Sequence, residues 1–231
     1  MCGIVAVTGY KKAVPLLLYG LEKLEYRGYD SAGIAVINSD SKNITCNKAE
    51  GKLKNLISKL KNKNISGTVG IGHTRWATHG KPEVKNAHPH LDSSGKVAVV
   101  QNGIIENFQE LKSKLEKEGI VFNSDTDTEV IPHLIQRELN TLSKLKLENN
   151  GSTLLVAVRN VISDIEGSYA LAVLWTGAPN SLVVARSQAP LIIGLGEGEF
   201  ICASDTPAIG HFTNIILPLE DEEIALLTPL G

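Results

Sequence analysis

Cys2 follows Met1 in the sequence, and removal of Met1 leaves Cys2 as the terminal residue. A terminal cysteine carries a thiol nucleophile and a free α-amine on the same carbon atom. Such an amine has a pKa of about 7.7 to 8.0, so part of it is unprotonated at neutral pH and can take the thiol proton. The position of Cys2 therefore predicts nucleophilic catalysis with the amine as general base. The alternative is that Cys2 is a small buried apolar residue that opens a strand.

Four further segments are polar at points where a strand or turn would not require it. Each combines residue types that can bind or polarise a substrate, such as arginine, asparagine, aspartate and histidine. The segments are 26–33 (YRGYDSAG), 73–80 (HTRWATHG), 101–107 (QNGIIEN) and 124–129 (SDTDTE). Two of them overlap the ends of expected strands, where functional side chains often collect on a rigid scaffold.

Together with Cys2, these segments resemble the glutaminase domains of glutamine amidotransferases. The segments 26–31 and 73–79 are most similar to the hexosamine-forming branch, the glutamine:fructose-6-phosphate amidotransferases. Related domains occur in amidophosphoribosyltransferase, asparagine synthetase and glutamate synthase. The resemblance covers essentially the whole chain, so we expect residues 1–231 to form one glutaminase domain, with the sugar-isomerase domains absent. It implies an α+β fold, the four-layer αββα sandwich of N-terminal-nucleophile hydrolases, in which two mainly antiparallel sheets lie between helical layers.

The resemblance also implies a role for individual residues. Asn102, through its side-chain amide, and Gly103, through its backbone N–H, would form an oxyanion hole for the reaction at Cys2. Arg75 would bind the carboxylate of glutamine, which suits a guanidinium fork, and Asp127 would bind its α-ammonium group. The other implied residues are Trp76, Thr78 and His79, in a loop that closes over glutamine, and Arg27, which supports the nucleophile.

Each of these residues also has a purely structural interpretation. Arg75 could form a structural salt bridge, and Asp127 could stabilise the N-terminus of the helix expected after it. A strand that ends in an asparagine and a glycine is also typical of a turn. A tryptophan such as Trp76 is commonly a core residue. We expect Asp125, although it lies close to Asp127, to have no role in the site.

The implied activity is hydrolysis of L-glutamine to glutamate and ammonia through a γ-glutamyl thioester on Cys2. The ammonia would pass to fructose 6-phosphate on a sugar-isomerase domain or subunit, in an enzyme that is a homodimer when complete. One alternative is an amidase or amidotransferase of the same fold with another substrate or acceptor. Another is a glutamine-binding regulatory module without turnover. Because Cys2 needs a free amine, the activity depends on removal of Met1.

Composition excludes several other classes of function. The 231 residues carry a net charge of −2, with no basic excess that could bind nucleic acid. No apolar run approaches the 18 residues that suggest a membrane span, and the three scattered cysteines suit free thiols in a reducing compartment. We therefore expect a cytoplasmic protein without cofactor. The histidines at 73, 79, 88 and 90 lack a zinc-binding motif, so we expect no metal.

Hydrophobic periodicity predicts strands and helices along the whole chain. The expected strands in the first half are 2–8, 31–38, 43–48, 68–75 and 96–102. The expected helices are 11–25, 53–61, 105–117, 128–139 and 153–165. Short strands at 169–175, 182–185, 191–194, 200–203, 215–217 and 223–227 would form an antiparallel meander. Thr126 and Glu129 have the spacing of a capping box, Pro132 is expected to kink the early turns of its helix, and the glycines at 194, 196 and 198 indicate a turn.

Overall fold

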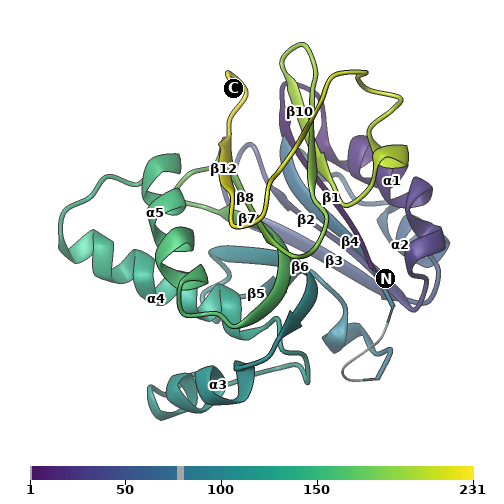
Figure 1. The fold of residues 1–231 in the computed structure, drawn as a ribbon. Coiled ribbons are helices and arrows are strands. Elements are labelled where there is room, and N and C mark those ends of the chain that lie inside the picture. Colours follow the sequence, from purple (N-terminus) through teal and green to yellow (C-terminus); the bar gives the residue numbers. More distant parts are fainter. Residues whose placement is uncertain (1, 77–80) are drawn as a thin grey trace.

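Two β-sheets stack face to face in this protein, and helices cover the outer face of each (Figure 1). The structure is a computed structural model that describes residues 2–76 and 81–231. This arrangement is the four-layer α+β sandwich expected from the resemblance. Within the described residues, no helix combines the length and apolar character needed to cross a lipid bilayer.

The larger sheet has seven strands in the order β11-β9-β10-β1-β4-β2-β3, counted over the described part of the chain, and all its paired strands are antiparallel. Its strands are β1 (Gly3–Gly9), β2 (Ser31–Ile37), β3 (Ile44–Glu50), β4 (Val69–Arg75), β9 (Ile192–Leu195), β10 (Glu199–Ala203) and β11 (Ile216–Pro218). The smaller sheet has the order β12-β8-β7-β6-β5 and is also antiparallel. Its strands are β5 (His90–Leu91), β6 (Val97–Ile105), β7 (Gly167–Trp175), β8 (Leu182–Ser187) and β12 (Ile224–Leu227).

The helices form two groups, one on each side of the stacked sheets (Figure 1). Helices α1 (Ala13–Lys23) and α2 (Leu53–Leu60) pack on the larger sheet. Helices α3 (Phe108–Lys117), α4 (Val130–Lys144) and α5 (Gly151–Ile162) pack on the smaller one. Three short 3-10 helices are also present in the described residues: η1 (Glu25–Arg27), η2 (Val84–Asn86) and η3 (Thr206–Ala208).

Strand β1 shows how the sequence produces these layers. Successive side chains of a strand point to opposite faces. Ile4 and Ala6 enter the core between the two sheets, whereas Val5 and Val7 enter the core between the larger sheet and its helices. All four are fully buried, so the run of apolar residues on both faces predicts a strand covered on both sides, and the structure confirms it.

Some expectations for the chain after residue 95 were wrong in detail. Strand β6 continues through Gly103 to Ile105, so α3 begins only at Phe108. The short strands after Gly167 are antiparallel, but they do not form one meander. Strands β7, β8 and β12 belong to the smaller sheet, whereas β9, β10 and β11 extend the larger one. The expected turn at 194–198 is confirmed as the hairpin between β9 and β10.

The start of α4 also differs from the expectation. Thr126 does not cap the helix, because the first helical residue is Val130. The carboxylate of Glu129 instead accepts hydrogen bonds from the backbone N–H groups of Asn123, at 2.9 Å, and Ser124, at 2.6 Å. Pro132 is the third helical residue, where a backbone N–H has no partner within the helix, so its ring removes no helical hydrogen bond and requires no kink.

Candidate active site

The candidate site lies where the layer between the two sheets reaches one end of the sandwich. On β4, Val69 and Ile71 face this inter-sheet layer, and Arg75 has the same parity along the strand. The same alternation places Cys2 in line with Ile4 and Ala6. Asn102 likewise continues the inter-sheet face of β6. Because β1 begins where β4 ends, with Gly3 opposite Thr74, the two strands bring Cys2 beside Arg75.

Cys2 is held by its backbone and its sulfur. Its carbonyl oxygen accepts hydrogen bonds from Arg27 Nε and from Asn102 Nδ2, each at 3.0 Å. Its Sγ accepts from the backbone N–H of Trp76 at 3.2 Å, and the thiol lies 3.5 Å from the Trp76 carbonyl oxygen. The nucleophile predicted from the sequence is therefore bonded to Trp76, which follows β4, to Asn102 in β6 and to Arg27 in η1.

Burial raises the pKa of the Cys2 thiol above its ordinary value, because a thiolate loses hydration there. The Trp76 N–H and the nearby cationic groups of Arg75 and Arg27 act in the opposite direction but do not outweigh burial. The thiol is therefore protonated at rest near neutral pH. A reaction at this sulfur needs a base that removes the proton as the bond to carbon forms.

Arg27 is buried and links Cys2 to a residue that the sequence analysis did not single out. Its Nη1 forms a salt bridge of 3.0 Å with Asp205 Oδ2, and the same oxygen accepts a hydrogen bond from Tyr26 at 2.5 Å. The hydrogen bond from Tyr26 is the main cause of the lowered pKa of Asp205, so this carboxyl stays ionised. Asp205 follows β10 at a sheet end, but its distance in sequence from the other segments left no local signal.

Asn102 and Gly103 lie within β6, not in the turn that was the alternative interpretation. Asn102 is buried, and its Oδ1 lies 3.0 Å from His73 Nε2. Gly103 has a φ of +110°, and a Cβ at this position would lie 2.1 Å from the carbonyl oxygen of Ser168. Only glycine fits this backbone without strain.

Arg75 is buried at the end of β4, and its Nη1 donates to the Lys81 carbonyl oxygen at 3.3 Å. Burial lowers the pKa of its guanidinium, while the charges of Cys2, Asp30 and Asp127 counteract that change. The guanidinium therefore stays cationic and lies in the field of Asp127.

Asp127 and Asp125 have different surroundings, as expected. Asp127 is buried, and its Oδ2 accepts the backbone N–H of Ile105 at 2.8 Å, which ties it to the end of β6. Asp125 is exposed and pairs with Lys85 at 2.8 Å. Asp127 precedes α4, but the contact with Ile105 gives its carboxylate a partner outside the helix.

A small cavity of about 30 Å³ joins these residues. Its lining includes six of the predicted site residues: Cys2, Arg75, Trp76, Asn102, Gly103 and Asp127. Four further residues line it that the sequence analysis gave no role in the site: His88, Gln101, Thr126 and Thr128. Gln101, Thr126 and Thr128 lie within the polar segments, so those segments were the available signal for them. His88 lies eight positions after the segment 73–80 and had no such signal.

Trp76 lines this cavity and is 44% exposed. Its ring meets that of Tyr29 edge to face, with centroids 5.4 Å apart. The other two residues expected in the closing loop, Thr78 and His79, lie outside the described residues. Ligand sites usually measure about 300 Å³ or more, so this cavity must widen before it can hold an amino acid.

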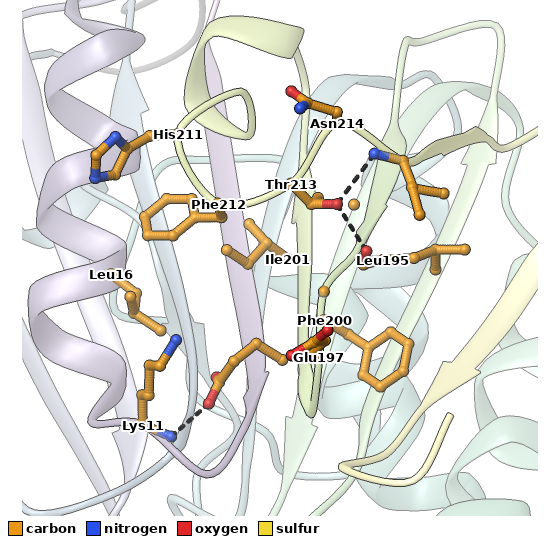
Figure 2. Close-up of a pocket in the computed structure, with 14 residues that line it drawn as sticks. Lys11, Leu16, Leu195, Glu197, Phe200, Ile201, His211, Phe212, Thr213 and Asn214 are labelled. Carbon is orange, nitrogen blue, oxygen red and sulfur yellow. Dashed lines mark hydrogen bonds between the residues drawn. The ribbon is translucent and has the colours of Figure 1, made fainter.

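A larger cavity of about 1000 Å³ lies elsewhere, beside α1 and the segment 211–215 (Figure 2). Lys11, Glu199 and Phe212 line it, and none of the predicted site residues that the structure describes does so. Glu199 pairs with Gly9 at the far end of β1, roughly 20 Å from Cys2 at the rise of a strand. The residues predicted to act as nucleophile and oxyanion hole therefore lie together at the smaller cavity.

The described residues contain no group of three or more histidine, cysteine or acidic side chains that could hold a metal ion. The three cysteines, Cys2, Cys46 and Cys202, are free thiols. Burial raises the pKa of the Cys202 thiol strongly, so Cys202 is an inert core residue.

Comparison with known proteins identifies relatives of this chain in sequence and in fold. A family model described as a glutamine amidotransferase domain matches residues 73–211. The glutamine–fructose-6-phosphate aminotransferase (isomerizing) of Thermosynechococcus vestitus is 56% identical over 231 residues, which is 100% of this chain and 36% of that protein. The chain thus spans about a third of the length of this relative.

Two solved structures share the fold at 27% sequence identity. The glutamine phosphoribosylpyrophosphate amidotransferase of B. subtilis has a TM-score of 0.76, over 99% of this chain and 49% of that one. A structure described as the allosteric regulatory enzyme of purine biosynthesis has a TM-score of 0.82, over 100% of this chain and 48% of that one. With the family model matching more than half of its residues, the chain belongs to the glutamine amidotransferase domain family.

Proposed function

We propose that this chain is a glutaminase domain that releases ammonia from L-glutamine through a thioester on Cys2. The observation that carries the proposal is that Cys2, Arg75, Asn102, Gly103 and Asp127 line one cavity. These residues supply a nucleophile, a cation, an anion and two hydrogen-bond donors. Glutamine presents an amide carbon, a carboxylate and an α-ammonium group, so each of its polar groups finds a complementary partner.

In this mechanism the thiol of Cys2 attacks the side-chain amide carbon of glutamine. The α-amine of Cys2 accepts the thiol proton, because burial keeps the thiol protonated at rest. The oxygen of the amide gains negative charge and is bound by the Asn102 amide and the Gly103 N–H. The amine then returns the proton to the leaving ammonia, and a water that it activates releases glutamate. Met1 must be removed first, since a peptide bond would otherwise occupy the amine.

Arg75 and Asp127 would select α-amino acid amides. The Arg75 guanidinium can bind the α-carboxylate with two parallel hydrogen bonds. Asp127 Oδ2 accepts the Ile105 N–H, and its Oδ1, which has a long contact of 3.5 Å with Thr128 Oγ1, can meet an ammonium group. Binding of glutamine widens the cavity, and movement of the exposed Trp76 side chain is the least costly way to do so. Arg27 supports the reaction by holding the Cys2 carbonyl.

For the complete enzyme, we propose that the ammonia aminates fructose 6-phosphate to form glucosamine 6-phosphate. The relative at 56% identity carries the name glutamine–fructose-6-phosphate aminotransferase (isomerizing) and is nearly three times as long as this chain. Residues 1–231 would then be one glutaminase domain, and a sugar-isomerase domain or subunit would receive the ammonia. We further propose a cytoplasmic enzyme that is a homodimer when complete.

The test is glutamate release from glutamine by the chain after removal of Met1, with Cys2→Ala as the matched control. Intact mass spectrometry first establishes that Met1 is absent. We expect the processed chain to release glutamate and the Cys2→Ala variant not to do so. We also expect a glutamine-like electrophile to label Cys2 covalently in the processed chain. Equal activity of the two proteins would end the proposal. Binding of glutamine without labelling or turnover would favour a regulatory module.

Substrate comparison separates a glutaminase from another amidase of the same fold. We expect glutamine to be hydrolysed in preference to asparagine, because the extra methylene sets the distance between the amide and the groups bound by Arg75 and Asp127. Simple amides without an α-amino acid group should be the poorest substrates. A preference for such an amide would contradict the roles proposed for Arg75 and Asp127.

A further inference from the structure

Three histidine side chains lie at the candidate site and have no part in the proposed mechanism: one lines its cavity and the other two contact that one. His73, His88 and His90 are all buried. The rings of His73 and His88 are stacked, with centroids 4.2 Å apart and planes 14° apart, and His90 meets His88 edge to face at 4.7 Å. A stacked pair of imidazoles cannot carry two positive charges without repulsion. Such a pair can still orient its neighbours, because each neutral ring has one donor and one acceptor nitrogen.

The hydrogen bonds around His73 determine its tautomer. Its Nε2 lies 3.1 Å from the backbone carbonyl oxygen of Gln101 and 3.0 Å from Asn102 Oδ1. A backbone carbonyl can only accept, so Nε2 must carry the hydrogen. The orientation of Asn102 is consistent with this, because its other end, Nδ2, donates to the carbonyl oxygen of Cys2. The Nδ1 of His73 is buried and has no hydrogen-bond partner among the described residues, as suits a bare lone pair.

His88 makes a second directional connection. Its Nδ1 accepts the backbone N–H of Gln101 at 3.3 Å, so its Nε2 carries the hydrogen. This Nε2 lies 3.4 Å from Thr128 Oγ1, whose own hydrogen points to Gln101 Oε1 at 2.7 Å. His88 therefore joins strand β6 to the residue that follows Asp127. The Thr128 hydroxyl also lies 3.5 Å from Asp127 Oδ1, which is the more distant of its two acceptors.

Burial keeps both rings neutral over the working range of pH. It lowers the pKa of His73 to about 3 and that of His88 well below its ordinary value. For His88 the neighbouring His73, His90, Arg75 and Lys48 lower the pKa further. Two neutral rings with determined tautomers are suited to hold other groups in place, and poorly suited to accept a proton from Cys2.

We propose that His73 and His88 are positioning residues with separate tasks. His73 holds the Asn102 amide with its N–H₂ group towards Cys2, and His88 holds the loop that carries Asp127 and Thr128 against β6. The inference rests on the proposed function, because it assumes that Asn102 binds the oxyanion and Asp127 binds glutamine. The connections themselves do not depend on that assumption.

The two tasks predict different kinetic defects. An oxyanion donor acts mainly in the transition state, so a misplaced Asn102 lowers kcat. Asp127 binds glutamine before and during the reaction, so a loosened loop raises KM. We expect His73→Leu to lower kcat by about 10² with KM changed less than about threefold. We expect His88→Leu to raise KM by about tenfold, while kcat changes less than about threefold.

Glutamine substitutions supply the conservative variants, because the amide nitrogen of glutamine reaches about as far as Nε2 of histidine. His73→Gln should recover most of the kcat that His73→Leu loses, and His88→Gln should restore most of the KM that His88→Leu raises. His211→Gln, at an exposed histidine that lines the larger cavity, is the matched control and should leave both constants unchanged. The proposal of separate tasks is wrong if His73→Leu and His88→Leu alter the same kinetic constant by the same factor. It is also wrong if neither His73→Gln nor His88→Gln recovers the activity that the leucine variant loses.

A measurement on the unmodified chain keeps the inference testable even if a leucine variant does not fold. Nitrogen NMR of histidine-labelled protein at neutral pH distinguishes the two neutral tautomers from each other and from the imidazolium. We expect Nε2–H with bare Nδ1 for both rings, assigned by the signals missing in the glutamine variants. An Nδ1–H tautomer or an imidazolium at His73 would overturn the inference. Failure of the processed chain to release glutamate would instead overturn the proposed function and leave the tautomer result standing.

Discussion

The side-chain amide of Asn102 donates a hydrogen bond to the backbone carbonyl of Cys2 over 3.0 Å. The proposed oxyanion-binding group is therefore bonded to the residue that carries the proposed nucleophile. This contact aligns the two groups before any substrate arrives. It also makes the orientation of one amide decisive, because a rotated Asn102 would present its oxygen to the carbonyl of Cys2.

Asn102→Asp should therefore abolish most of the activity while changing the volume of the side chain little. An ionised carboxylate repels both the Cys2 carbonyl and the oxyanion, and loss of one such donor typically lowers kcat by about 10² to 10³. Steady-state glutaminase assays measure this, and KM should change much less. Asn107→Asp, at the exposed surface contact with the Asp164 carbonyl, is the matched control. Comparable losses in the two variants would argue against an oxyanion role for Asn102.

Asp127→Asn tests the proposed ammonium site without removing the contact that holds the residue. The asparagine oxygen can still accept the Ile105 N–H, so the loop keeps its position while the negative charge is lost. Loss of a charged hydrogen bond to the substrate should lower kcat/KM for glutamine by about 10- to 100-fold, chiefly through KM.

Asp125→Asn is the natural comparison for Asp127→Asn, since it removes the same charge two residues earlier. Its carboxylate is exposed and pairs with Lys85, away from the cavity. We expect unchanged kinetic constants for this variant. If Asp125→Asn impaired glutamine use as much as Asp127→Asn, general charge in this loop would matter and the specific contact would not.

Gly103→Ala should lower the stability of the protein as well as its glutaminase activity. A Cβ at this position meets the Ser168 carbonyl at 2.1 Å, and a φ of +110° is itself strained for alanine. Such strain costs about 1 to 3 kcal/mol, before any cost of moving β7 away. Gly95→Ala is the matched control, because Gly95 has a φ of +68° but no atom within 4 Å of its Cβ position. Urea unfolding should show a clearly larger loss for Gly103→Ala. Equal losses would mean that backbone conformation alone accounts for the effect.

The position of Gly103 within β6 is a feature that the sequence did not predict. The alternating apolar residues of β1 and β4 predicted those strands almost to the residue, because burial on both faces leaves a local pattern. In contrast, Asn102 and Gly103 resemble a turn when read locally. They lie in a strand because β6 pairs with β7, whose opposing residues stand more than 60 positions later. Pairing at that separation leaves no trace in the segment itself.

The site was predictable to a similar extent. Its residues could be named from Cys2 and the four polar segments, and those that the structure describes lie together apart from Arg27, which contacts Cys2 from outside the cavity. The connections between them could not be predicted. The sequence analysis considered His73 and His88 only as metal ligands, whereas their roles depend on hydrogen-bond directions set by β6 and the Asp127 loop. Asp205 was missed because its partner Arg27 lies 178 positions away.

Asp205→Asn should show how much the anchoring of Arg27 matters. The Asp205 carboxylate pairs with Arg27, whose Nε donates to the carbonyl of Cys2. Without this charge, Arg27 gains freedom and the terminus that carries the nucleophile is held less firmly. We expect kcat to fall by about tenfold with little change in KM, since a 1 Å misplacement alone can lower the rate substantially. Asp221→Asn, which breaks a similar aspartate contact with Arg186 at 3.0 Å, should leave kcat unchanged. Equal effects would show that loss of a surface ion pair explains both.

The buried histidines predict that stability falls as the pH falls below about 6.5. In the folded protein, burial lowers the pKa of His73 to about 3, whereas in the unfolded chain it returns to about 6.5. Between these values the unfolded chain binds more protons than the folded one, so the free energy of unfolding rises with pH in this window and is level above it. Each such histidine contributes a slope of up to about 1.4 kcal/mol per pH unit.

Urea unfolding at pH 7.5, 6.0 and 5.0 measures this slope, and His73→Gln isolates one histidine. The variant removes one titrating group, so its stability should fall less steeply between pH 6.5 and 5.0 than that of the unmodified chain. His211→Gln should keep the full slope, because that histidine is exposed. Below about 4.5 the loss steepens in all three proteins, since hydrogen bonds to the carboxylate of Glu129 outweigh its burial and lower its pKa to about 2. If His73→Gln and the unmodified chain have the same slope above pH 5, His73 is already protonated in the folded state. Its hydrogen bond to Asn102 would then come from an imidazolium and not from a neutral ring.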